Sequence, residues 1–112
     1  MKRLLLFTAS IFLSISLSWS QLIITGVVDG PLTGGTPKAI ELYALSDIPD
    51  LSIYGLGSAN NGGGSDGIEY TLPATSIAAG SFFYVSSDID QFTAFFGFPA
   101  HVEGGSAALV NG

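Results

Sequence analysis

The stretch from Lys38 to Leu56 constrains the fold more than any other part of the sequence. It holds two short apolar segments on either side of a loop that contains Asp47, Pro49 and Asp50. Apolar residues that alternate over segments this short predict β-strands, and Asp and Pro between them predict a turn. The stretch therefore predicts an all-β fold, with strands over residues 38–45 and 51–56.

The first twenty residues differ from the rest of the chain. Lys2 and Arg3 precede the mainly apolar run Leu4 to Leu17, and Ser18-Trp19-Ser20 follows it, with small residues on either side of a larger one. This run is shorter than the roughly 20 residues of a transmembrane helix. Residues 1–20 are therefore predicted to be a secretory signal peptide. Cleavage after Ser20 would leave residues 21–112 as one small domain, secreted or held at the cell surface, with no membrane contact of its own.

Composition excludes several classes of function. The sequence has no cysteine, so disulfides and thiolate metal sites are excluded. After signal cleavage one basic residue, Lys38, would remain against nine Asp and Glu residues. Nucleic-acid binding requires clustered Lys and Arg, so direct binding of nucleic acid by this segment is not expected.

Further segments continue the β pattern. Leu22 to Val28 is predicted to be a strand that closes at Asp29-Gly30-Pro31, before a turn-rich connection that ends at Pro37. The remaining predicted elements are strands over residues 68–72, 81–86 and 107–110, and one helix over Asp88 to Phe96 capped by Asp88 or Asp90. Asn111-Gly112 is a preferred hairpin turn whose return strand would lie beyond the sequence, so a fragment of a longer protein is expected.

The order of these segments resembles the lamin-tail domain family. The matching pieces are Leu22 to Val28, Ile40 to Tyr43, Asp47 to Asp50, Leu51 to Tyr54, Glu69 to Pro73, and Ala79-Gly80 leading into Phe82 to Val85. The resemblance covers about residues 22–98 and implies an immunoglobulin-like β-sandwich of the lamin-tail type, as found in secreted bacterial proteins. The last strands of such a sandwich would lie past Gly112.

Because no reaction is shared by members of this family, the resemblance implies a non-catalytic binding or spacer module. Its partner would be an extracellular protein or a glycan. The alternative is an N-terminal accessory domain of a secreted metal-dependent nuclease or phosphodiesterase whose catalytic domain lies beyond residue 112. Fold alone does not decide between these functions.

No combination of side chains predicts catalysis. Glu41 stands alone in its strand, where a structural role is expected, because a catalytic acid needs a second titratable group beside it. His101 is the only histidine and has no second ligand or nucleophile in a recognisable motif. Asp88-Ile89-Asp90 lacks the glycine and terminal glutamate of an EF-hand loop.

The glycine-rich loop from Gly57 to Gly67 partly matches the calcium-binding β-roll repeat, with Asp66 in the ligand position. Such sites form between stacked repeats, and the sequence holds one copy. A flexible loop and no cofactor are therefore expected, with a calcium-stabilised module using Asp66 as the remaining alternative.

Most of the aromatic residues are expected to form the core, because a small domain without disulfides needs large buried side chains. Tyr43 and Tyr54 are the exceptions. They fall on the mixed faces of two strands predicted to be neighbours. They are the candidate surface-recognition residues.

Overall fold

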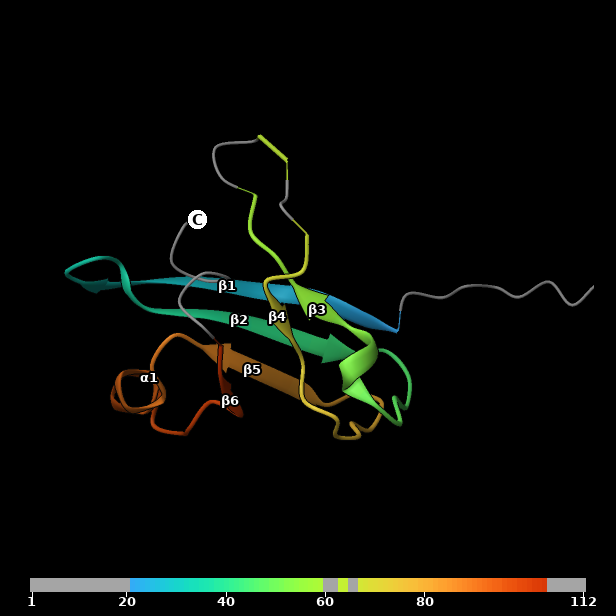
Figure 1. Cartoon of the computed structure of the whole chain (residues 1–112). Coiled ribbons are helices and arrows are strands. Elements are labelled where there is room, and N and C mark those ends of the chain that lie inside the picture. The colour runs from blue at the N-terminus through green and yellow to red at the C-terminus, as the bar shows by residue number, and fades with distance from the viewer. Residues whose placement is uncertain (1–20, 60–62, 65–66, 105–112) are drawn as a thin grey trace, which may run out of the picture.

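The computed structural model describes residues 21–59, 63–64 and 67–104. Its described part is an all-β fold with two sheets and one α-helix (Figure 1). The signal peptide expected over residues 1–20, Asp66 and the strand expected over residues 107–110 lie outside the described residues.

Four strands form the larger sheet, in the order β1-β2-β5-β6. These strands are β1 (Leu22–Leu32), β2 (Thr36–Ala44), β5 (Phe82–Ser86) and β6 (Val102–Glu103). β1 and β5 each pair antiparallel with β2, whereas β6 pairs parallel with β5. A parallel pair needs a crossover connection. Helix α1 (Ile89–Phe96) lies in that connection, between β5 and β6.

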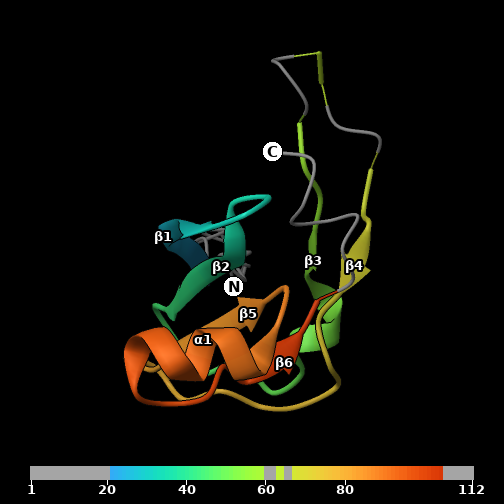
Figure 2. The same ribbon diagram turned by 90° about the vertical axis from the view of Figure 1, so that its left-hand side faces the viewer.

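The smaller sheet consists of two short antiparallel strands, β3 (Gly55–Leu56) and β4 (Tyr70–Thr71). An isolated bridge between Ile48 and Ile77 lies outside the named strands. Figure 2 shows β3 and β4 on one side of the larger sheet and α1 on the other. The larger sheet is therefore the middle layer of the molecule.

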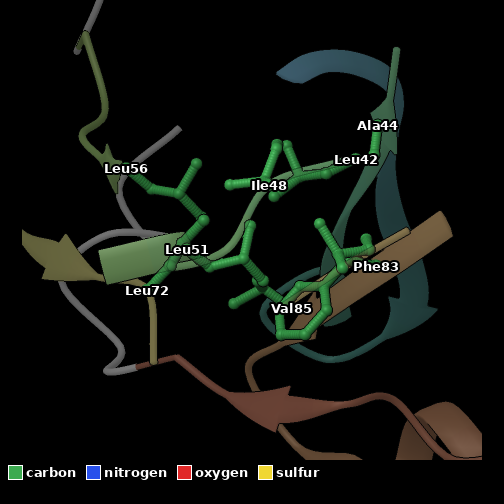
Figure 3. Packing of buried hydrophobic residues seen from close by; sticks show 9 residues of the cluster. Leu42, Ala44, Ile48, Leu51, Leu56, Leu72, Phe83 and Val85 are labelled. Atoms are coloured by element: carbon green, nitrogen blue, oxygen red, sulfur yellow. The ribbon is translucent and has the colours of Figure 1, made fainter. Parts of the chain in front are cut away.

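The main core fills the space between the two sheets. Leu42 and Ala44 of β2 and Phe83 and Val85 of β5 face the smaller sheet. Opposite them, the connections and the smaller sheet contribute Ile48, Leu51, Leu56 and Leu72 (Figure 3). Ile77 belongs to the same buried cluster. The strand alternation predicted for β2 is confirmed, since Leu42 and Ala44 are buried on one face.

The first hairpin differs from its prediction. β1 does not close at Asp29-Gly30-Pro31 but continues to Leu32, and Asp29 pairs with Lys38 of β2. The turn lies at residues 33–35, where Gly35 has a φ of 72° and its N–H donates to the Leu32 carbonyl. Glycine adopts this left-handed backbone conformation without a steric penalty, and the conformation matches the twist of the two strands that the turn joins.

The strand predicted over residues 51–56 is wrong in its first half. Leu51–Ile53 is a 3-10 helix, and only Gly55–Leu56 pairs as a strand. The carboxylate of Asp50 accepts hydrogen bonds from the N–H and the hydroxyl of Ser52, at 2.9 and 2.6 Å. This local capping by an aspartate competes with sheet pairing, so the chain turns before it extends. The strand predicted over residues 68–72 is likewise shorter, at Tyr70–Thr71.

The predicted strands over residues 38–45 and 81–86 and the predicted helix are confirmed. Asp88 caps α1, because its Oδ1 accepts a hydrogen bond from the Gln91 N–H at 2.9 Å. The helix ends at Gly97, which adopts a φ of 78°. A left-handed glycine is a common C-cap, and it turns the chain back toward the sheet.

Candidate binding groove

A cluster of aromatic rings covers the outer face of the larger sheet, on the side of α1. Phe92 of α1 is buried against Ala39 of β2 and Ala100, with Tyr84 packed beside them. The Phe92 ring centroid lies 5.6 Å from that of Tyr84, 4.6 Å from that of Phe96 and 5.4 Å from that of Phe98. The helix therefore holds a set of rings in fixed contact above the sheet.

The expectation that most aromatic residues form the core is wrong for several of the phenylalanines. Phe83 and Phe92 are buried, whereas Phe82, Phe95, Phe96 and Phe98 are exposed. Phe96 and Phe98 keep 43% and 41% of their surface in contact with solvent although they pack against Phe92. Exposed rings that are nevertheless held by a buried ring are suited to contact a ligand.

Glu41 lies next to these rings on the same face of the sheet. It stands between Gly26 of β1 and Tyr84 of β5 in the strand register. Its Oε1 accepts a hydrogen bond from the Thr25 hydroxyl at 2.8 Å, and its Oε2 accepts one from the Tyr84 hydroxyl at 2.9 Å. The two donors come from the two neighbouring strands and fix the orientation of the carboxylate.

A groove of about 300 Å³ opens between the sheet and α1. Gly26, Val27, Val28, Ala39, Glu41, Tyr84, Phe92, Phe96 and Phe98 line it. Among the described residues that line it, Glu41 is the one charged residue and Tyr84 supplies the other polar side chain. A concave, mostly apolar surface with a few oriented polar groups is the usual form of a ligand site.

Tyr84 connects the carboxylate to the rings. Burial raises the pKa of Tyr84, and its hydrogen bond to the Glu41 carboxylate and the charge of that carboxylate raise it further. The phenol therefore remains a neutral hydrogen-bond donor to Glu41 at physiological pH. Glu41 therefore links β2 to its two neighbouring strands through these hydrogen bonds, and it also lines the groove.

His101 supports the same strand from its edge. The Tyr84 N–H donates to Nδ1 of His101 at 2.9 Å, and the His101 N–H donates to the Tyr84 carbonyl at 3.0 Å. Burial lowers the pKa of His101. An imidazole that accepts at Nδ1 must be unprotonated there, so the ring takes the place of a strand partner for Tyr84.

The two tyrosines predicted to form a recognition surface are not neighbours in the sheets. Tyr43 lies in β2, whereas Tyr54 follows the 3-10 helix and packs against the main core. The hydroxyl of Tyr54 lies 3.5 Å from Oε1 of Gln21. The prediction that they lie on adjoining strands is therefore wrong.

Tyr43 does connect with the groove through a row of rings. Its centroid is 5.0 Å from that of Phe82, which is in turn 6.4 Å from that of Tyr84. Tyr84 then contacts Phe98 at 5.2 Å. One of the two predicted tyrosines thus lies at the end of an aromatic row that leads to the groove.

The other candidate polar residues do not meet there. Asp88 caps α1 and Asp90 lies exposed in its first turn. Glu69 accepts hydrogen bonds from the N–H and the hydroxyl of Ser58, at the start of the glycine-rich loop. Within the described residues no three His, Cys, Asp or Glu side chains gather in a metal-binding arrangement. Asp66, the one candidate calcium ligand, lies outside those residues.

Sequence reasoning did not find the groove. Its members are far apart in the sequence, and only the register of β1, β2 and β5 brings Gly26, Glu41 and Tyr84 into line. One usable signal was a helix whose Phe92 and Phe96 share a face, followed by Gly97 and a further phenylalanine. Phe95, Phe96 and Phe98 are exposed close together in the sequence, and adjoining exposed apolar residues are a better indication of an interaction site than single ones.

In the part of the chain that the structure describes, no helix is long and apolar enough to cross a membrane. Comparisons with protein-family models, with curated proteins and with solved structures find no match to this chain.

Proposed function

We propose that this chain is a non-catalytic binding domain of a secreted or cell-surface bacterial protein. Its ligand, an extracellular protein or a glycan, would bind in the groove between the larger sheet and α1. The observation that carries this proposal is the pair of exposed, well-packed rings of Phe96 and Phe98 beside the oriented carboxylate of Glu41. Exposed aromatic residues beside a few fixed polar groups are typical of recognition surfaces.

The proposed architecture is an immunoglobulin-like sandwich of the lamin-tail type. Two facing sheets with a shared apolar core support it. The parallel pairing of β5 with β6 adds a feature that purely antiparallel sandwiches lack. The connection between these two parallel strands carries α1 over the outer face of the larger sheet, where the helix forms one wall of the groove.

Export through an N-terminal signal peptide belongs to the same proposal. The basic pair and apolar run of the first twenty residues support it. Expression of the full sequence in a bacterial host should give a product in the medium whose mass corresponds to a chain that begins at Gln21. A product that keeps residues 1–20 and remains with the cells would contradict cleavage after Ser20.

The binding test uses a panel of extracellular proteins, glycans and cell-wall preparations with the immobilised chain. Phe96→Ala and Phe98→Ala should abolish the capture of any ligand found. Phe95→Ala is the matched control, because Phe95 is 48% exposed on the same helix but does not line the groove. A chelator should leave the capture unchanged, since the proposed site uses no metal.

Two results would count against this proposal. If no member of the panel binds, a spacer is the better description of the domain. If a ligand binds equally well to the wild-type chain, Phe96→Ala and Phe98→Ala, recognition lies elsewhere on the surface.

A further inference from the structure

The chemistry of the groove narrows the class of ligand that it can hold. Seven of the nine described residues that line the groove are apolar or glycine, and the Tyr84 hydroxyl donates a hydrogen bond to Glu41, the other polar residue. A sugar would need partners for several hydroxyl groups, and this lining offers few. The part of the ligand that enters the groove must therefore be mainly apolar.

The groove also carries one uncompensated negative charge. Both donors to the Glu41 carboxylate, the hydroxyls of Thr25 and Tyr84, are neutral and leave its charge in place. The one salt bridge within the described residues joins Lys38 to Asp29, with Nζ 2.7 Å from Oδ1. Glu41 therefore has free acceptor capacity and no cation beside it in the described part of the chain.

The aromatic rings next to Glu41 attract cations, as its carboxylate does. The faces of aromatic rings are negative, so they bind cations, and alkylated ammonium groups are the best-known ligands of this type. A lysine ammonium is compact and strongly hydrated, and it would lose water in a lining with few acceptors. A quaternary ammonium spreads its charge over alkyl groups and has no hydrogen-bond donors to satisfy.

We propose that the groove binds a quaternary ammonium group, with its alkyl groups against Phe96, Phe98 and Tyr84 and its charge beside Glu41. This inference rests on the proposed function, because it names the chemical group of the protein or glycan ligand that would enter the same groove. Gly26 gives the group access to the carboxylate. A Cβ at this position would lie 3.4 Å from the Glu41 Cβ and 3.6 Å from its Oε1, in space that the glycine leaves open.

The experiment compares choline with 3,3-dimethyl-1-butanol, which has the same shape but carbon in place of the charged nitrogen. Each is titrated into the purified chain, and backbone amide chemical shifts are followed by NMR. Choline should shift the signals of residues in the groove. The neutral analogue should bind at least about tenfold more weakly, because it lacks the charge that Glu41 and the rings attract.

Variants separate the contribution of charge from that of shape. Glu41→Gln should weaken choline about tenfold and leave the neutral analogue unchanged. Phe96→Ala should weaken both compounds, and Gly26→Ala should weaken choline by placing a methyl group over the carboxylate. Phe95→Ala should change neither titration.

If the wild-type chain binds the neutral analogue as tightly as choline, or binds neither, the ammonium assignment is overturned. This comparison needs no variant, so it decides the question even if Glu41→Gln fails to fold. The proposed function is judged separately, by whether Phe96→Ala abolishes capture of a ligand from the protein, glycan and cell-wall panel. A loss of that capture together with equal binding of the two small molecules would keep the groove as a binding site and reject its preference for cations.

Discussion

The hydroxyl of Tyr84 donates to Oε2 of Glu41 across 2.9 Å and joins two neighbouring strands of the larger sheet. The same tyrosine ring contacts Phe92 and Phe98, so one side chain connects the carboxylate of the groove lining with its aromatic wall. Substitutions of Tyr84 should therefore change both the free energy of unfolding of the chain and the lining of the groove.

Tyr84→Phe should lower the free energy of unfolding by about 1 kcal/mol, because it removes one hydrogen bond and keeps the ring contacts. Urea unfolding of the two proteins measures this difference. If the wild type and Tyr84→Phe were equally stable, the hydrogen bond from the Tyr84 hydroxyl to Glu41 would contribute no more than the hydrogen bonds that this hydroxyl makes to water in the unfolded chain.

Tyr84 should also make the wild-type chain sensitive to alkaline pH. Its folded-state pKa is raised, chiefly by burial, so an unfolded chain releases the phenolic proton at lower pH than the folded chain does. The stability that Tyr84 contributes is complete below a pH of about 10 and is lost as pH rises through the folded-state value. Melting curves of the wild type and Tyr84→Phe should converge as pH rises in this range, and a constant difference would contradict the assignment.

Phe92→Ala should lower the free energy of unfolding by about 3–5 kcal/mol, because it leaves a cavity between α1 and the sheet. Phe95→Ala, on the same helix but largely exposed, should change it by no more than about 0.5 kcal/mol. Urea unfolding followed by circular dichroism measures both. Similar losses in the two variants would mean that α1 does not pack through Phe92.

Asp88→Ala should destabilise the chain by about 1 kcal/mol, because the Gln91 N–H loses its acceptor at the start of α1. Asp88→Asn keeps a capping oxygen and is the matched control. Thermal unfolding of the three proteins measures the difference. If Asn and Ala are equally destabilising, the charge of Asp88 rather than its hydrogen bond stabilises the helix.

Acid should weaken the contact between His101 and Tyr84. The folded-state pKa of His101 is lowered by burial, so the unfolded chain takes up the proton at higher pH than the folded chain does. The stability from the neutral ring is therefore complete above a pH of about 6.5 and is lost as pH falls through the folded-state value.

His101→Asn isolates this effect, since asparagine offers an acceptor oxygen to the Tyr84 N–H but does not titrate. Melting temperatures measured between neutral and mildly acidic pH should fall more steeply for the wild type than for the variant. Parallel curves would show that His101 does not titrate during unfolding in this range.

Much of the secondary structure followed from local sequence. Strands formed from the β-branched and apolar residues of 22–28, from the alternation in 38–45 and from the aromatic run at 82–85. The helix predicted over Asp88 to Phe96 is within one residue of the observed bounds of α1. These elements depend on residues within a few positions of one another. The local pattern gave the wrong element where a side chain bonded a nearby backbone group, as the Asp50 carboxylate does when it accepts a hydrogen bond from the Ser52 N–H.

The sequence by itself thus determined an all-β chain with one capped helix, because strand alternation and helix caps are short-range properties. Tertiary structure alone decided that Phe96 and Phe98 stay exposed, that Tyr54 packs against the main core, and that Gly26, Glu41 and Tyr84 share one face. Register sets such relations, since a shift of one residue would move every side chain to the opposite face of the sheet. The groove is a product of that register and of the crossover that carries α1.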